Sequence, residues 1–123
     1  MTGEYQPFER LSPRYEVSFA CSLTEMADRP HSTTKRSPKH YLGVIDELSI
    51  NGGQLELSSR VEWDPEITRF ELEVEGVPSL IRVLGHRVDR GRRVVGFDFL
   101  ELSPGFQRLL HDSIAEAKGM QST

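Results

Sequence analysis

Apolar and polar residues alternate along much of the chain up to residue 102. In the segment YEVSFACS, residues 15–22, Val17, Phe19 and Cys21 alternate with polar or small residues. A period of two is typical of a strand with one buried face. Similar alternation, or a short run of apolar and β-branched residues, predicts further strands at residues 41–49, 53–59, 67–76, 79–88 and 93–102.

The period changes after the last of these segments. Phe106, Leu110 and Ile114 recur at helical spacing, Ser103 and Pro104 provide a cap and a first helical position, and Gly119 is expected to end the helix. The sequence therefore predicts an all-β protein with five to six short antiparallel strands and a C-terminal α-helix. Strands of this kind in so small a chain favour a closed barrel, which leaves no exposed edge.

The length of 123 residues fits one domain with a single modest core. We expect a flexible N-terminal arm at residues 1–14 and one barrel domain with its helix at residues 15–119. Residues 24–40 contain two prolines and many hydroxyl side chains without periodicity, which predicts a long surface loop. A loop of that length is usually either mobile or functional.

Charge and hydropathy exclude several classes of protein. The chain has 15 basic and 19 acidic residues, a net charge of −4, which argues against a general DNA- or RNA-binding surface. No apolar run approaches the roughly 18 to 20 residues of a membrane span. The first residues are polar and lack the pattern of a secretory signal, so we expect a cytoplasmic protein without membrane insertion.

Candidate catalytic and metal-binding motifs are missing from the sequence. The four histidines lack ligand spacing, and no GxSxG, HExxH or GxxxxGK[ST] motif occurs. Cys21, the single cysteine, lies in a predicted strand and is interpreted as a packing residue. We therefore expect a binding protein, not an enzyme, with no catalytic residues, no metal and no cofactor.

Two arginines stand on an extended segment before the first strand. In RLSPR, residues 10–14, Pro13 removes a backbone donor and biases Ser12 toward extended geometry. Arg10 and Arg14 therefore do not share a helix face, and in an extended arm they lie roughly 13 Å apart. Solvated surface charge is the simpler interpretation of such a pair taken alone.

A second motif follows in ELSINGG, residues 47–53. Together with RLSPR, this segment resembles the signatures of the PilZ domain, RxxxR and [D/N]xSxxG, which occur in that order in a family of bacterial cyclic di-GMP receptors. The resemblance implies a six-stranded barrel and a ligand site formed by Arg10, Arg14, Glu47, Ser49 and Gly52. Arginine suits such a ligand, because its planar guanidinium binds phosphate and stacks on bases. Ser49 and Gly52 alone are also compatible with a plain hairpin turn.

Glu47 departs from the family pattern, which has Asp or Asn at this position. The neighbouring Asp46 points to the opposite face of a regular strand, and only a bulge would re-aim it. Two functions remain open: a cyclic di-GMP receptor that relays binding to a protein effector, or a PilZ-like adaptor that binds proteins without the nucleotide. The resemblance suggests a role in motility, surface polymers or biofilm behaviour.

Overall fold

The computed structural model describes residues 13–26, 38–58 and 60–121, the side chains of Met120 and Gln121 excepted. These residues form six strands followed by one helix. The elements are β1 (Tyr15–Glu25), β2 (His40–Leu48), β3 (Gly52–Ser58), β4 (Arg69–Val74), β5 (Val77–Asp89), β6 (Arg92–Leu102) and α2 (Pro104–Gln121).

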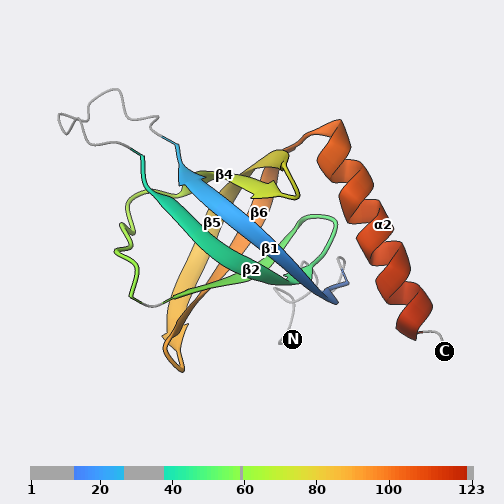
Figure 1. Cartoon of the computed structure of the whole chain (residues 1–123), viewed down its shortest axis with the longest axis horizontal. Coiled ribbons are helices and arrows are strands. Elements are labelled where there is room, and N and C mark those ends of the chain that lie inside the picture. Colours follow the sequence, from blue (N-terminus) through green and yellow to red (C-terminus); the bar gives the residue numbers. More distant parts are fainter. Residues whose placement is uncertain (1–12, 27–37, 59, 122–123) are drawn as a thin grey trace, which may run out of the picture.

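The strands form a closed antiparallel barrel in the order β1-β2-β3-β6-β5-β4 (Figure 1). Consecutive hairpins make most of the pairs, but β3 pairs with β6 and β1 closes the barrel against β4. The predicted all-β barrel with a C-terminal helix is confirmed. Closure leaves no strand edge without a partner in this sheet, as expected for so small an all-β domain.

The barrel interior is filled by the apolar residues of the alternating pattern. Leu55 of β3 pairs with Val95 of β6, and both side chains are fully buried. Phe106 and Leu110 of α2 are buried as well, and Phe106 contacts Phe99 edge to face at 5.4 Å between ring centroids. The residues that alternate with these core residues along each strand therefore face outward.

The first strand extends farther than predicted, and the second begins and ends one residue earlier. Thr24, Glu25 and His40, which were expected in the loop at residues 24–40, lie in β1 and β2. Glu25 is buried and accepts hydrogen bonds from the backbone amide of Lys39 (3.1 Å) and the hydroxyl of Tyr41 (3.2 Å). These bonds satisfy a carboxylate that would otherwise disfavour a buried strand position. Residues 27–37 of the predicted loop lie outside the described residues.

The helix begins as predicted and ends later. The hydroxyl of Ser103 accepts a hydrogen bond from the backbone amide of Phe106 (3.1 Å), the expected N-cap. The prediction that Gly119 ends the helix is wrong, because α2 continues to Gln121. A glycine inside a helix costs only about 1 kcal/mol relative to alanine, which does not require the helix to end. No helix among the described residues has the length and apolar character needed to cross a membrane.

Cys21 and Trp63 belong to the packing of the barrel. Cys21 is buried, and burial raises the pKa of its thiol to about 11, which disfavours the reactive thiolate. The ring of Trp63 stacks on Phe70 at 5.4 Å and packs against the core. Trp63 is thus partly buried against the barrel core.

Candidate functional site

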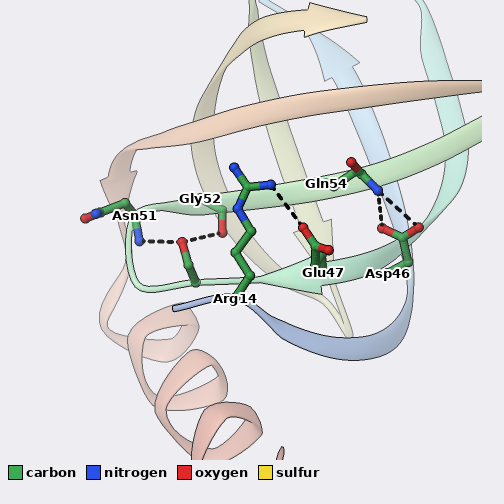
Figure 2. Close-up of polar contacts among 7 residues, drawn as sticks. Arg14, Asp46, Glu47, Asn51, Gly52 and Gln54 are labelled. Carbon is green, nitrogen blue, oxygen red and sulfur yellow. Dashed lines mark hydrogen bonds and ion pairs between the residues drawn. The ribbon is translucent and has the colours of Figure 1, made fainter. Parts of the chain in front are cut away.

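The turn between β2 and β3 is organised by Ser49. Its hydroxyl accepts a hydrogen bond from the backbone amide of Asn51 (3.2 Å) and donates one to the carbonyl of Gly52 (3.3 Å). The backbone amide of Ser49 also donates to the carbonyl of Gly52, at 2.8 Å. Ser49 is therefore buried as part of the turn itself, and Figure 2 shows Asn51 and Gly52 of this turn together with Arg14.

Gly52 is required by the contact between two strands. A Cβ atom at this position would collide with the backbone carbonyl of Phe97 on β6. Gly52 pairs with Asp98, so the absence of a side chain allows β3 and β6 to approach where the turn leads into the sheet. Gly52 thus has a structural role in the barrel, whatever else it contacts.

A β-bulge in β2 determines where two adjacent carboxylates lie. Ile45 pairs with Leu55 and Glu47 pairs with Gln54, so Asp46 is the extra residue of the bulge. A bulge is the only means of re-aiming Asp46 that the sequence left open, and this bulge is present. Asp46 accepts hydrogen bonds from the amide nitrogen of Gln54 at 3.3 and 3.5 Å.

Arg14 and Glu47 form an ion pair across the start of the barrel. A guanidinium nitrogen of Arg14 lies 3.2 Å from a carboxylate oxygen of Glu47, and the two side chains are 53% and 31% exposed. Figure 2 shows Arg14 reaching across the hairpin toward β3. The pair is accessible to water, so it contributes at most about 1 kcal/mol to stability. Arg14 can therefore leave Glu47 and bind another acceptor.

Arg14 and the turn line one cleft with a volume of about 550 Å³, within the usual size range of small-molecule sites. The cleft is formed by the turn, β3, β5 and β6. Its lining residues are Arg14, Ser49, Asn51, Gly52, Gly53, Gln54, Leu84, Gly96, Phe97, Asp98 and Phe99.

The structure thus brings together three of the five predicted site residues, Arg14, Ser49 and Gly52. Glu47 is bonded to Arg14 but does not line the cleft. Arg10 lies outside the described residues. No group of three or more His, Cys, Asp or Glu residues in the described part of the chain is arranged to hold a metal ion.

The remaining cleft residues were not predicted from the sequence. Gln54 follows Gly52 by two positions and so shares its strand face, a signal that was available from the period of two. Gly96 and Asp98 come from β6, which pairs with β3 across a long sequence separation. Leu84 is the extra residue of a bulge in β5 between Val83 and Gly85, which places its exposed side chain at the cleft.

The pKa of Asp46 is raised, although this residue lies near the surface. Partial burial and a hydrogen bond to Glu56 raise the pKa of Asp46 to about 6, and the same bond lowers the pKa of Glu56. The protonated Asp46 is therefore favoured by the fold. Its stabilising contribution is complete below the unfolded value of 3.8 and is lost as the pH rises through about 6.

We expect Asp46→Asn to stabilise the protein at about pH 8 relative to the wild type, with a smaller difference at about pH 4. Asparagine can donate to Glu56 and accept from Gln54 without ionising, as protonated Asp46 does. Thermal unfolding at both pH values measures the difference. Asp112→Asn, which changes an exposed carboxylate on α2, is the matched control. A loss of stability in Asp46→Asn at pH 8 would contradict this account of the bulge.

No protein-family model and no curated protein matches the sequence. The structure is similar to the solved structure of the PilZ domain with c-di-GMP of YcgR from Escherichia coli. The TM-score is 0.54, the sequence identity is 15%, and the match covers 89% of this chain and 92% of that chain. The chain has a PilZ-like fold. The resemblance drawn from RLSPR and ELSINGG is confirmed at the level of the fold.

Proposed function

We propose that the protein is a PilZ-type receptor that binds cyclic di-GMP and relays the binding to a protein effector. Arg10, Arg14, Glu47, Ser49 and Gly52 are the proposed ligand-binding residues, with Arg10 and Arg14 acting on the phosphates or bases. The protein is in this proposal a cytoplasmic binding module, not an enzyme, and it requires no cofactor. The solved PilZ domain of similar fold is a complex with c-di-GMP, which supports the choice of ligand.

The observation that carries the proposal is the shared cleft. Arg14 comes from the segment before β1, whereas Ser49 and Gly52 come from the β2–β3 turn. All three residues line the same cleft. A guanidinium at the rim matches the charge and geometry of a phosphate, and its planar face can stack on a base. Phe99 and Leu84 add apolar surface to the cleft, as a base requires.

Two exposed apolar side chains, one in the β2–β3 turn and one lining the cleft, support a relay to a protein. Ile50, within the turn, and Leu84, in the bulge of β5, are 55% and 59% exposed. Exposed apolar residues beside a ligand site are suited to partner contact once the ligand fixes the turn. The effector is in this proposal a protein that recognises the occupied cleft.

The alternative is a PilZ-like adaptor that binds proteins without the nucleotide. Arg14 is already paired with Glu47, and Ser49 and Gly52 both serve the turn and the strand contact. These residues are thus accounted for without a ligand. Titration of the purified protein with cyclic di-GMP by calorimetry separates the two functions, because only the receptor gives saturable heat.

We expect Glu47→Asp to tighten cyclic di-GMP binding by roughly tenfold. Glutamate reaches Arg14 at 3.2 Å, and the shorter aspartate withdraws from that pair, which frees the guanidinium and restores the acceptor of the family signature. The fold should remain intact, because the exposed ion pair contributes little to stability. Calorimetry at one salt concentration measures the change.

Glu71→Asp, which shortens an exposed glutamate on β4, is the control for this substitution. It should leave the affinity unchanged. If neither the wild type nor Glu47→Asp binds while both remain folded, the adaptor is the better description. Weaker binding by Glu47→Asp would show that Glu47 itself is adapted to the ligand.

A further inference from the structure

The outer face of β3 and β6 presents hydrogen-bond acceptors to the cleft. Leu55 and Phe97 are core residues, so their neighbours Gln54, Gly96 and Asp98 face outward along the cleft. Gln54 pairs with Gly96, and Gly52 pairs with Asp98. Because Gly96 has no side chain, the space in front of Gln54 is open.

The amide group of Gln54 is held in one orientation. Its nitrogen lies 3.3 and 3.5 Å from the two carboxylate oxygens of Asp46. An ionised carboxylate only accepts hydrogen bonds, so the nitrogen of Gln54 must face Asp46. The amide oxygen then points away from Asp46, as Figure 2 shows. The bulge in β2 places Asp46 where it imposes this orientation.

An amide fixed in this way discriminates between bases. A free glutamine recognises adenine through both its oxygen and its nitrogen, one accepting from the amino group and the other donating to a ring nitrogen. Gln54 has its nitrogen engaged and presents mainly an acceptor. Guanine has two adjacent donors, the ring N1–H and the amino group, which suit an acceptor. Asp98, whose carboxylate lies 3.7 Å from Arg82, adds a second acceptor to the same cleft.

We propose that Gln54 determines the specificity of the cleft for a guanine base over adenine, and that Asp46 is the positioning residue that holds the Gln54 amide in the selective orientation. The inference rests on the proposed function, since it concerns the base of the dinucleotide bound there. It assigns a role to two residues that belong to neither PilZ signature in this chain.

The test compares cyclic di-GMP with cyclic di-AMP. Calorimetry at about pH 8, where Asp46 is ionised, is carried out on the wild type, Gln54→Leu and Asp46→Ala. We expect the wild type to bind cyclic di-GMP roughly tenfold or more tightly than cyclic di-AMP. This ratio corresponds to about one good hydrogen bond that guanine makes with Gln54 and adenine does not. Gln54→Leu should weaken cyclic di-GMP binding and reduce this preference. Asp46→Ala should reduce the preference while leaving cyclic di-GMP bound, because alanine has no acceptor for the Gln54 nitrogen and no longer fixes the amide.

Gln107→Leu, the same substitution at an exposed position of α2, is the matched control and should retain the wild-type ratio of affinities. A merely structural role of Asp46 would change the melting temperature or both affinities together, but not their ratio. If the wild type prefers cyclic di-GMP and neither variant changes the ratio, the inference is overturned and the proposed function stands. Preference of the wild type for cyclic di-AMP also overturns it. Binding of neither nucleotide overturns the proposed function and this inference with it.

Discussion

Substitution of Gly96 by leucine should reduce cyclic di-GMP binding by at least about a hundredfold, or about 2.7 kcal/mol. Gly96 lines the cleft, and a Cβ built on it has no atom within 4 Å. A larger side chain at this position therefore extends into the cleft and occupies the volume that a base requires. The effect should grow with side-chain size, from small in Gly96→Ala to intermediate in Gly96→Val and largest in Gly96→Leu.

The series is informative because the fold should tolerate it. Glycine inside a strand reduces stability, so replacement by a strand-forming residue should leave the melting temperature unchanged or raised. Gly119→Leu is the control, because Gly119 lies on α2 and its Cβ also has open space. Full binding by a folded Gly96→Leu protein would show that the ligand binds elsewhere on the barrel.

The barrel was largely predictable because most of its determinants are local. The alternation of Val17, Phe19 and Cys21, and its counterparts in later segments, reports the burial of one strand face. The change to helical spacing after Ser103 is equally local. The extra length of β1 was not predictable from local sequence. Glu25 depends on hydrogen bonds from Lys39, which lies just before β2, and from Tyr41, near the start of β2.

Only those residues of the candidate site that belong to a family signature were predictable from the sequence. Ser49 and Gly52 stand out in the sequence, but the carbonyl of Phe97 that makes Gly52 necessary is on β6. Gly96 and Asp98 reach the cleft because β6 inserts between β3 and β5, a non-local order that periodicity does not encode. The bulge at Asp46 adds one residue to a strand without a turn residue or a proline to mark it.

Among the predicted site residues that the structure describes, Arg14 is the one whose removal should weaken binding most. We expect Arg14→Ala to reduce the affinity for cyclic di-GMP by roughly ten- to hundredfold, the effect of losing charge-assisted hydrogen bonds worth about 1.5 to 3 kcal/mol. Arg14→Lys should recover only part of the loss, since lysine keeps the charge but not the planar fork. The free energy of unfolding should change little, because the Arg14 side chain is 53% exposed and its ion pair with Glu47 is solvated.

The control for Arg14 is Arg108→Ala, which removes an exposed arginine from α2. Both variants lower the net charge equally, so any difference in affinity reflects position rather than the overall field of the protein. Combining Glu47→Ala with Arg14→Ala tests whether the effect of Glu47 on the affinity depends on Arg14. If the Glu47 carboxylate competes with the ligand for Arg14, Glu47→Ala should tighten binding in the wild-type background but not when Arg14 is absent. Equal affinities of Arg14→Ala and Arg108→Ala would remove Arg14 from the site and leave the cleft to a ligand without phosphate, or to a protein.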